Sequence, residues 1–390
     1  MRTQVCIIGG GPAGLFLAHV LHIAGIDSIV IERQTEDHVL SRIRAGVLEA
    51  GTVDLLRQYG LADRMDRDGM PKDGTRIFWE GKEDFWIDAL RWTGRRMMVW
   101  GQTQITEDLY AARERDGGEM IFRVENVTLH DLDGTPSVTF DRHGESHRID
   151  CDFIAGCDGF HGPSRMAIPA DIRREYERVY PFGWLGIMVE KPPMKELAYA
   201  YHSEGFAMAS RRNPMLSRYY VQVPSTDRVE DWSDDRFWEA LHRRLPEHVH
   251  GEIETGPSIE KSIAPLRSFV AEPMRWGKLF LAGDAAHIVP PTGAKGLNLA
   301  FSDVFYLSRA LIMHFKQNSD RYLDSYSEMA LRRVWAAENI SWRMTKLLHV
   351  FPGEDPFDQK IRQSDFDLLV GSEDVQRAFA YEYMGLHFED

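Results

Sequence analysis

The sequence has little of several features that mark common classes of protein. Only three of its 390 residues are cysteines, Cys6, Cys151 and Cys157, and their spacing fits neither a disulfide framework nor a metal site. No apolar run reaches membrane length, and the first predicted strand begins too close to Met1 to leave room for a signal peptide. We therefore expect reduced thiols, no bound metal, no membrane partner and a cytoplasmic location.

Excess positive charge is also missing. The chain carries 46 basic against 60 acidic residues, a formal net charge of −14 at pH 7. Nucleic acid and anionic membranes repel a protein of this charge, so neither is an expected partner, while a local basic pocket for a small anion stays open. Hydrophobic residues at 43% and charged residues at 27% are ordinary for a globular protein.

The first 47 residues hold the most informative pattern. A predicted strand runs into Gly9, Gly11 and Gly14, followed by an apolar helix and a second strand that ends at Glu32. Gly9 allows a tight turn, Gly11 lets the backbone approach a pyrophosphate, and Gly14 lets the helix pack closely on the strand. Glu32 can accept hydrogen bonds from a ribose diol. A glycine-rich turn alone would carry little weight, but with both strands in register it predicts an adenine dinucleotide, either FAD or NAD.

The remaining pattern divides the chain into three predicted regions, 1–175, 176–289 and 290–390. The first combines the dinucleotide-binding unit with a β ribbon near 75–100. The second is rich in strands, has one helix at 234–245, and returns at its end to the nucleotide site. Further helices are predicted over 12–24, 104–115, 296–316 and 324–347. The predicted fold is mixed α/β, with a Rossmann-like nucleotide domain, a β-rich substrate domain and a helical C-terminal region.

Two further glycine–acid motifs follow the first, Asp158-Gly159 and Gly283-Asp284. The three motifs in this order resemble the single-component flavoprotein aromatic hydroxylases. The resemblance covers essentially the full length. Its strongest strings are 42–49, 154–162, 179–186, 217–224 and 279–298. It implies that the nucleotide is FAD, tightly bound.

The resemblance implies a carboxylate-binding end of the substrate site. Arg212 matches the arginine that holds the substrate carboxylate, and a guanidinium fork suits a planar anion. Ser210, Arg211 and Tyr220 are expected beside it. By spacing alone, 210–212 would instead be interpreted as a solvent-exposed charged turn.

The resemblance also implies a phenol-binding end. Tyr199 matches the tyrosine that bonds the substrate phenol, Tyr383 the one behind it, and Pro291 the residue whose carbonyl lies near the substrate hydroxyl. Lys72 stands where well-known members of the family have a histidine that ends the proton path. Lysine, with a reference pKa near 10.4, relays protons near neutrality only if that pKa is strongly shifted.

The FAD-contacting positions follow in the same way. They are Gly9, Gly11, Ala13, Gly14, Glu32, Arg42, Ile43, Arg44, Ala45, Gly46, Val47, Gln102, Asp158, Asp284, Leu297 and Asn298. One inference does not depend on the family. Residues 293–296 precede a long helix, whose N-terminus would stabilise the negative charge of reduced flavin, with Lys295 adding positive charge.

The resemblance places a second, transient nucleotide nearby. The positions implied for NAD(P)H are Arg33, Gln34, His38, Arg44, His161 and Arg267. Arg33 could pair with the 2′-phosphate of NADPH, but Glu36 and Asp37 lie in the same loop and repel it. We therefore expect use of NADPH and possibly of NADH as well.

The implied reaction is hydroxylation of 4-hydroxybenzoate at C3 to 3,4-dihydroxybenzoate, using NAD(P)H and O2 through a flavin C4a-hydroperoxide, in a homodimer. A sibling hydroxylase of another hydroxy- or aminobenzoate is the first alternative. A non-catalytic FAD-fold binding protein, such as an escort of prenylated GTPases, is the second. The three are distinguished by which aromatic acid, if any, stimulates the oxidation of NAD(P)H.

Overall fold

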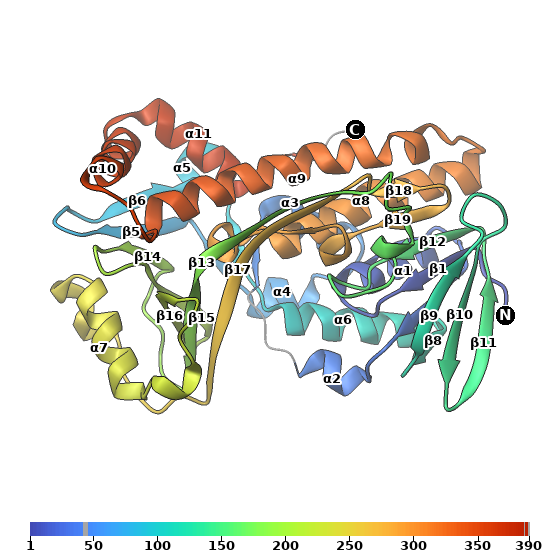
Figure 1. The fold of residues 1–390 in the computed structure, drawn as a ribbon, viewed down its shortest axis with the longest axis horizontal. Coiled ribbons are helices and arrows are strands. Elements are labelled where there is room, and N and C mark those ends of the chain that lie inside the picture. Colours follow the sequence, from blue (N-terminus) through green and yellow to red (C-terminus); the bar gives the residue numbers. More distant parts are fainter. Residues whose placement is uncertain (42–45, 386, 389–390) are drawn as a thin grey trace.

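A six-stranded sheet organises the nucleotide-binding half of the molecule. The computed structural model describes residues 1–41, 46–385 and 387–388, and its elements are shown in Figure 1. The strand order is β18-β19-β12-β1-β2-β8, and only β18 is antiparallel to its neighbour. These strands span Arg275–Trp276 (β18), Leu279–Leu281 (β19), Phe153–Gly156 (β12), Val5–Ile8 (β1), Ser28–Glu32 (β2) and Met120–Phe122 (β8). Every residue of β1, β12 and β19 is buried, as expected for parallel strands covered on both faces.

Long helices pack around this sheet. Helix α1 contacts both α6 and α8, and α8 in turn packs along α9. These helices span Pro12–Ile23 (α1), Gln102–Arg115 (α6), Gly296–Gln317 (α8) and Arg321–Leu348 (α9). Each agrees with the helix predicted for its stretch of sequence to within three residues. Figure 1 shows α9 running along the top of the molecule above both halves.

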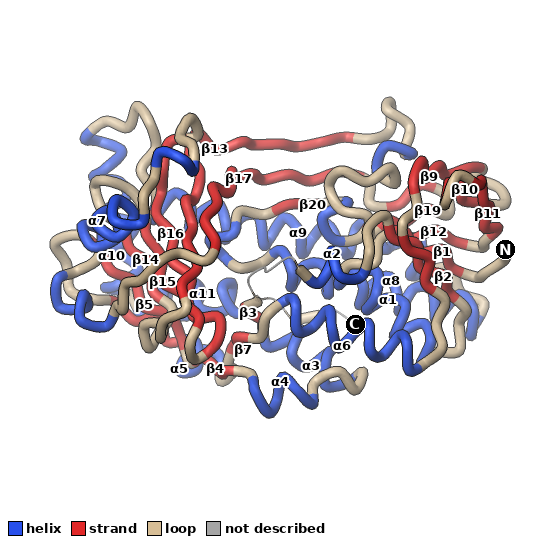
Figure 2. The backbone as a smooth tube through the Cα atoms, turned by 90° about the horizontal axis from the view of Figure 1, so that it is seen from below, coloured by secondary structure: helices blue, strands red, loops and turns tan. Residues whose placement is uncertain are grey.

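A larger, eight-stranded sheet forms the other half. Its order is β20-β17-β13-β16-β15-β14-β5-β6. The strands span His287–Ile288 (β20), Glu260–Glu272 (β17), Arg174–Val189 (β13), Leu216–Pro224 (β16), Ala207–Asn213 (β15), Ala198–Tyr201 (β14), Gly74–Trp79 (β5) and Phe85–Asp88 (β6). Strands β13 and β17 are so long that they bridge the two halves as a ribbon, drawn at the top of Figure 2. Their register shifts between Val179 and Gly183, which divides the ribbon into two arms.

Smaller elements complete the fold. Two three-stranded sheets consist of β9 (Glu125–His130), β10 (Ser137–Arg142) and β11 (Glu145–Asp150), and of β3 (Val47–Leu48), β7 (Met97–Val99) and β4 (Met70–Lys72). The remaining helices are α2 (Glu36–Leu40), α3 (Ala50–Gln58), α4 (Asp63–Asp68), α5 (Ala89–Thr93), α7 (Asp234–Arg244), α10 (Pro356–Gly371) and α11 (Glu373–Met384). The predicted N-cap of α7 is confirmed, since the Ser233 side chain accepts a hydrogen bond from the Arg236 backbone.

The observed sheets refine the predicted division of the chain. The ribbon expected near 75–100 within the first region supplies β5 and β6, and β5 pairs in parallel with β14 of the large sheet. A boundary at residue 175 therefore does not coincide with the edge of that sheet. The two halves of the molecule bury separate apolar clusters, one around β1 and β12 and two around β13–β16.

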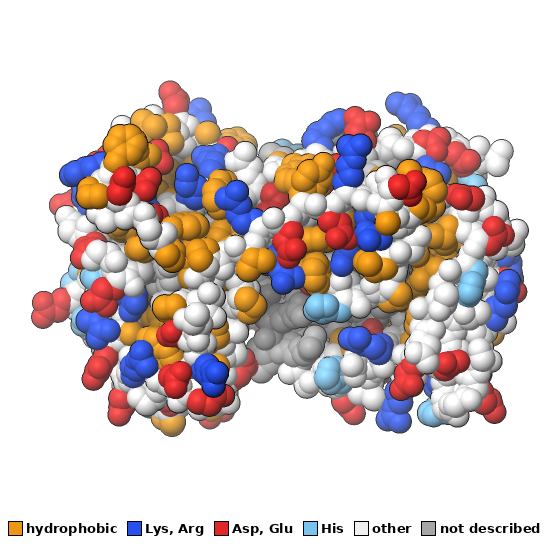
Figure 3. All heavy atoms as spheres, in the orientation of Figure 1, with side chains coloured by type: hydrophobic (Ala, Val, Ile, Leu, Met, Phe, Trp, Pro, Cys, Tyr) orange, Lys and Arg blue, Asp and Glu red, His pale blue; other side chains and the backbone are white. Residues whose placement is uncertain are grey.

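Charged side chains of both signs are mixed on the surface of the molecule that Figure 3 shows. On the face drawn in Figure 3, basic and acidic side chains alternate over both halves. Among the described residues, no helix combines the length and the apolar character needed to cross a membrane.

Candidate active site

One groove brings the three glycine–acid motifs together. It lies where the parallel strands β1, β2, β12 and β19 all end, so residues far apart in sequence meet at one sheet edge. Its empty volume is about 1210 Å³. The predicted residues that line it are Gly9, Gly11, Ala13, Glu32, Arg33, Gln34, His38, Gln102, Asp158, Asp284 and Leu297. An elongated groove of this make-up fits a dinucleotide.

The glycines of the first motif have different roles. Gly9 has a φ of +111°, and a Cβ there would lie 2.2 Å from the Cys157 carbonyl oxygen. A Cβ on Gly14 would lie 2.0 Å from the Gly9 carbonyl oxygen. A Cβ on Gly11 would meet no atom within 4 Å, although Gly11 lines the groove. The protein's own packing thus requires Gly9 and Gly14, whereas the open space at Gly11 is a cradle for a ligand.

Glu32 is held in place by backbone groups at the end of β2. Its Oε2 accepts a hydrogen bond from the Gly10 N–H at 2.7 Å, and its Oε1 accepts one from the Gln34 N–H at 2.8 Å. Tyr110 supports the same turn by donating to the Gly10 carbonyl oxygen at 2.8 Å. A carboxylate has further lone pairs, so Glu32 can still accept from a ribose diol in the groove.

Asp158 is a buried carboxylate with unused hydrogen-bonding capacity. Its Oδ2 accepts from the Ser164 N–H at 2.9 Å, while its Oδ1 is buried and has no partner within the described part of the chain. Burial raises its pKa above the usual range, although Ser164 and Arg165 oppose that shift. Asp158 lines the dinucleotide groove and a second groove beside it, so the free oxygen can receive a ligand hydroxyl.

The turn that carries Asp284 rests on a buried ion pair. The Gly283 N–H donates to Asp303 Oδ2 at 2.8 Å, and the same oxygen lies 2.6 Å from His287 Nε2. Burial disfavours charge on His287, but Asp303 outweighs burial and raises the His287 pKa. Asp284 itself is exposed and lines the groove.

The start of α8 faces the groove, but Lys295 does not. Gly296, Leu297 and Ala300 line the groove, so the positive end of the helix dipole is available to an anion there. Lys295 is 2% exposed, and its Nζ donates to Glu49 Oε1 at 2.7 Å and to the backbone carbonyls of Glu382 and Tyr383. Lys295 was expected to add positive charge near the flavin; its charge is paired with Glu49, and its side chain does not line the groove.

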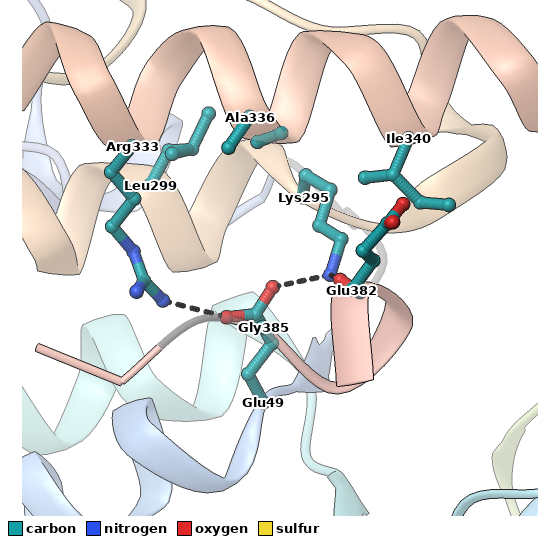
Figure 4. Close-up of a pocket in the computed structure, with 9 residues that line it drawn as sticks. Glu49, Lys295, Leu299, Arg333, Ala336, Ile340, Glu382 and Gly385 are labelled. Carbon is teal, nitrogen blue, oxygen red and sulfur yellow. Dashed lines mark hydrogen bonds and ion pairs between the residues drawn. The ribbon is translucent and has the colours of Figure 1, made fainter. Parts of the chain in front are cut away.

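Glu49 is the centre of a buried charge cluster that joins four segments. Its second oxygen accepts from Arg333 Nη2 of α9 at 3.0 Å, while Lys295 precedes α8 and bonds the end of α11, as Figure 4 shows. Gly385 passes so close that a Cβ there would lie 1.8 Å from Glu49 Oε2. The cluster fixes the end of α11, the helix that carries Tyr383, against the start of α8.

The Asn298 side chain holds the backbone that leads into α3 by hydrogen bonds. Its side-chain oxygen accepts from the Glu49 N–H at 2.9 Å and from Thr52 Oγ1 at 2.8 Å, and its side-chain nitrogen donates to the Val47 carbonyl oxygen. Val47 lies in β3, and Gly46 approaches the Trp100 backbone closely. The other predicted positions of this stretch, Arg42, Ile43, Arg44 and Ala45, lie outside the described residues.

The predicted substrate residues share one face of the large sheet. Tyr199 of β14 pairs with Met208 of β15, and Met208 pairs with Tyr220 of β16. Paired residues on neighbouring strands project to the same side of a sheet, so these three side chains form a row. Ser210, two residues after Met208, projects to the same side. The row was not recognisable from sequence spacing, since it draws on three separate strands.

Arg212 stands at one end of this row. Its Nη1 donates to Ser210 Oγ at 3.3 Å, and its Nε is buried without a partner among the described residues. Burial lowers the pKa of the guanidinium, while Tyr220 opposes that shift. Arg211 Nη1 lies 3.5 Å from Met70 Sδ, at a point where the register of β15 with β16 shifts.

A pair of buried tyrosines stands at the other end. Tyr199 and Tyr383 are each 1% exposed, and their hydroxyl oxygens lie 3.4 Å apart. The Tyr383 hydroxyl is also 3.2 Å from Thr75 Oγ1. Burial raises the pKa of both tyrosines, so both are protonated at neutral pH. Thr75 was not predicted, and a lone threonine in a strand gives no signal by which it could have been.

Two further predicted residues are Lys72 and Pro291. Burial and neighbouring Arg211 lower the Lys72 pKa to about 8, which is the direction that a near-neutral proton acceptor requires. Pro291 begins the short turn (Pro291–Gly293) before α8, and its carbonyl oxygen accepts from the Ala294 N–H at 3.0 Å. That oxygen retains a second lone pair for a ligand.

The residues predicted for NAD(P)H gather beside the dinucleotide groove. Arg33 and His161 line the adjoining second groove, while Gln34 and His38 line the first. The Arg267 guanidinium carbon lies 4.7 Å from the centre of the Phe160 ring, and that ring is 5.0 Å from the His161 ring. The structure thus brings Arg267 and His161 together around Phe160.

Metal ligands do not gather in the described part of the chain. No group of three or more His, Cys, Asp or Glu side chains is arranged to hold a metal ion there. Two buried polar residues that do matter, Asp303 and His287, were missed by sequence reasoning. The signal for Asp303 was a charged residue on the apolar face of a predicted helix.

Comparison with known proteins agrees with this site. The family model described as "FAD binding domain" matches residues 2–341. The p-hydroxybenzoate hydroxylase of Acinetobacter baylyi is 52% identical over 391 aligned residues, which cover 100% of this chain and 96% of that protein. The rifampicin monooxygenase of Streptomyces venezuelae is 29% identical, over 78% of this chain and 63% of its own length.

A solved structure supports the fold. The p-nitrophenol 4-monooxygenase PnpA of Pseudomonas putida superposes with a TM-score of 0.83 at 19% identity, covering 98% of this chain and 99% of its own. At this identity the likeness establishes the fold alone. Together with the family match and the full-length relative, it leads to one conclusion: the chain belongs to the FAD-binding monooxygenase family, and within it to the p-hydroxybenzoate hydroxylases.

Proposed function

We propose that the protein hydroxylates 4-hydroxybenzoate at C3, giving 3,4-dihydroxybenzoate, with FAD as cofactor and NAD(P)H and O2 as co-substrates. The single observation that carries this proposal is the sheet face on which Arg212 with Ser210 stands at one end and Tyr199 at the other. A para-hydroxybenzoate has a carboxylate and a phenol at opposite ends of one ring. The full-length relative named above has the corresponding activity in its name.

The carboxylate end consists of Arg212 and the groups that orient it. Ser210 bonds the guanidinium, and the Tyr220 hydroxyl interacts with it as well. A buried arginine with an unpartnered Nε holds a carboxylate through charge-assisted hydrogen bonds in a fixed plane. This contact would set the position of the ring along the row and would exclude benzenes that lack the acid.

The phenol end consists of Tyr199 and the hydroxyls behind it. Because burial keeps Tyr199 protonated, its hydroxyl can donate to the substrate oxygen and favour the phenolate. The chain of hydroxyls Tyr199, Tyr383 and Thr75 is proposed to carry the released proton toward Lys72, which precedes Thr75 by three residues. The Pro291 carbonyl is proposed to accept from the same substrate hydroxyl. A phenolate makes the neighbouring ring carbon electron-rich, which is the carbon to be hydroxylated.

The dinucleotide groove is proposed to hold FAD. Gly11 gives the backbone access to the pyrophosphate, Glu32 and Asp158 accept from sugar hydroxyls, and the α8 N-terminus faces the flavin end. When bound, FAD supplies the redox chemistry, accepting a hydride from NAD(P)H and activating O2. Arg42–Val47, Gln102, Asp284, Leu297 and Asn298 complete the proposed contacts, Asn298 by holding the 47–49 backbone.

The second groove is proposed to receive NAD(P)H. Arg33 and His161 line it, and Arg267 and Arg44 are proposed to help to hold its phosphates. Glu36 and Asp37 occupy the first turn of α2 beside these residues. Their negative charge opposes the extra phosphate of NADPH, so we propose that both reduced nucleotides are accepted.

We also propose that the protein is a homodimer in the cytoplasm. Three large apolar side chains lie on one face of α10, namely Phe357 at 70% exposed, Ile361 at 49% and Leu368 at 57%. Such a stripe on a surface helix is suited to a second copy of the chain. Phe357→Asp should convert a two-chain particle into a one-chain particle in light scattering, and an unchanged mass would exclude this face. The three cysteines are free thiols, in keeping with a reducing compartment.

The function is tested by the rates of NADPH and NADH oxidation in the presence of a panel of benzoates. We expect 4-hydroxybenzoate to stimulate oxidation most, and 4-aminobenzoate and 3-hydroxybenzoate to stimulate it less. Greater stimulation by either analogue would assign the protein to a sibling hydroxylase. Absence of nucleotide oxidation with every benzoate would favour a non-catalytic FAD-fold protein.

A further inference from the structure

A third groove, lined by aromatic side chains, lies between α9 and the arm of the β13–β17 ribbon that residues 174–180 and 267–272 form. From α9 it is lined by Trp335, Glu338, Asn339 and Trp342, which are spaced i, i+3, i+4 and i+7 and therefore share one helix face. From the ribbon it is lined by Tyr176, Arg178, Tyr180, Ser268 and Val270, which alternate along the paired strands and share one sheet face. The intervening residues Glu177 and Phe269 also contribute to its lining. The groove has an empty volume of about 990 Å³ and shares no lining residue with either nucleotide groove.

The floor of this groove is a buried carboxyl group with an unused oxygen. Glu338 is 6% exposed, and its Oε1 has no hydrogen-bond partner among the described residues. Ser268 and the Phe269 backbone also bond the carboxyl group, and Ser268 Oγ lies 3.2 Å from the Tyr180 hydroxyl. Burial raises the Glu338 pKa to about 7, while Ser268 and the charge of His287 oppose that shift. A buried unpaired oxygen costs free energy, which a ligand hydroxyl placed there would recover.

The walls are aromatic and carry one cation. Tyr176 is 44% exposed and Trp335 41%, and their rings meet edge to face with centroids 5.4 Å apart. The Arg178 guanidinium carbon lies 4.4 Å from the Trp342 ring centre, and no carboxylate of the described residues forms an ion pair with it. Of the other charged groups nearby, Glu177 is paired with Arg267 and His287 with Asp303. Glu272 accepts a hydrogen bond from Trp335 Nε1. Lys346 Nζ lies 5.7 Å from the Trp342 ring centre but does not line the groove. Arg178 is therefore the cation that a bound anion would meet.

We propose that this groove is a second small-molecule site for a hydroxylated aromatic acid, with its ring against Trp335 and Tyr176, its hydroxyl on Glu338 and its carboxylate toward Arg178. Flat aromatic walls suit a planar ring, and the two polar groups stand at the floor and on the wall, as the two substituents of such an acid require. The site is argued from its own residues and goes beyond the proposed reaction. Only the choice of 4-hydroxybenzoate as probe rests on the proposed function.

Equilibrium dialysis of the FAD-loaded protein against 4-hydroxybenzoate, without NAD(P)H so that no turnover occurs, tests the proposal. We expect about two equivalents bound per chain at saturation. Trp335→Ala and Glu338→Leu should each lose one equivalent and keep the one that perturbs the flavin absorbance spectrum. Arg212→Ala should lose the flavin-perturbing equivalent and keep the other. Benzoate, which lacks the hydroxyl, should bind the groove about tenfold more weakly, since one hydrogen bond to a charged group is missing.

The matched control is Ile23→Ala, an exposed apolar residue at the end of α1, which should keep both equivalents. Retained FAD and an unchanged thermal unfolding curve identify the folded variants, and Tyr176→Ala replaces any that fail. A single equivalent in the parent protein would overturn the proposal, as would two in both Trp335→Ala and Glu338→Leu. If 4-hydroxybenzoate leaves the flavin spectrum unchanged but one equivalent is lost in Trp335→Ala, the proposed reaction fails and the groove stands. A groove covered by a second copy of the chain would show as one equivalent and a two-chain mass that Trp335→Ala reduces, which also overturns it.

Discussion

The nucleotide groove and the substrate face are built in opposite ways. The groove is assembled from short contiguous motifs that each follow a parallel strand, and much of its recognition comes from backbone groups and from glycines. The substrate face is assembled from single side chains on β14, β15 and β16, completed by Tyr383 of the distant α11. Backbone recognition leaves a pattern in the sequence, whereas a row of side chains across a sheet leaves none. The two sites should therefore fail differently when they are mutated.

The largest effect is expected at the first glycine motif. Gly14→Val places side-chain atoms against the Gly9 backbone, where a Cβ alone would already lie 2.0 Å from the carbonyl oxygen. Such overpacking should destabilise the fold by about 3 kcal/mol or more and abolish FAD retention. Gly11→Ala is the matched control, since its Cβ meets nothing in the protein. It should unfold like the parent yet bind FAD more weakly, as measured by thermal unfolding and by flavin fluorescence. Equal loss of stability in both variants would contradict the separate roles.

The next largest effect is expected at Arg212. Arg212→Ala removes the charge-assisted contact to the substrate carboxylate, worth about 3 kcal/mol, and should raise the KM for 4-hydroxybenzoate on the order of 100-fold. FAD content should not change, because Arg212 lies on the sheet face. Arg211→Ala, one residue away and in contact with Met70, should change the KM little. If Arg212→Ala instead releases FAD, the residue is structural.

Tyr199→Phe tests the other end of the row. The variant should still bind substrate and oxidise NAD(P)H, but with on the order of tenfold less hydroxylated product, because one donor to the developing charge is gone. The comparison of product formed with nucleotide consumed measures the effect. Tyr219→Phe is the control, since Tyr219 is a buried tyrosine on the opposite sheet face, packed against Trp238. Full coupling in Tyr199→Phe would remove Tyr199 from the mechanism.

Lys72→Met should change the pH dependence of stability. The unfolded chain binds the Lys72 proton below the ordinary pKa of 10.5, and the folded chain only below about 8. Between these values the unfolded state binds more protons, so the free energy of unfolding falls as the pH is lowered from about 10.5 to 8. Lys72→Met should lack this fall and be more stable than the parent at pH 7, by at most about 3 kcal/mol. Chemical denaturation at several pH values measures the difference, and parallel curves for the two proteins would contradict the shifted pKa.

The smallest effect is expected beside the second groove. Glu36→Gln removes one negative charge at the start of α2 and should shift the preference toward NADPH by on the order of threefold, since an exposed charge is worth under 1 kcal/mol. The ratio of kcat/KM for NADPH and NADH measures this shift. Asp68→Asn, a like charge change on α4, should leave that ratio unchanged.

The sequence predicted the groove better than the substrate face for a physical reason. Gly9, Glu32, Asp158 and Asp284 each stand at the end of a buried strand or within three residues after it, so local pattern and tertiary position coincide. The long helices were likewise predictable, because their apolar periodicity extends over many turns. The pairing of β5 with β14 was not, since nothing local tells a strand which sheet it joins.

The direction of individual side chains was the other feature that could not be predicted from the sequence. Lys295 was expected to add positive charge near the flavin, but its side chain reaches Glu49 and the end of α11. Arg211 and Arg212 are neighbours in sequence, yet Arg211 Nη1 lies 3.5 Å from Met70 Sδ whereas Arg212 Nη1 bonds Ser210 Oγ. The roles of Arg212 and Tyr199 came from the family resemblance, because no local pattern links an arginine on β15 to a tyrosine on β14.

The most direct test of the account is the stoichiometry of the reaction. FAD-loaded protein is supplied with 4-hydroxybenzoate, O2 and a known amount of NADPH, and the aromatic product is identified and counted. We predict close to one molecule of 3,4-dihydroxybenzoate per NADPH consumed. Consumption of NADPH with no dihydroxylated product, or hydroxylation at another ring position, would contradict it.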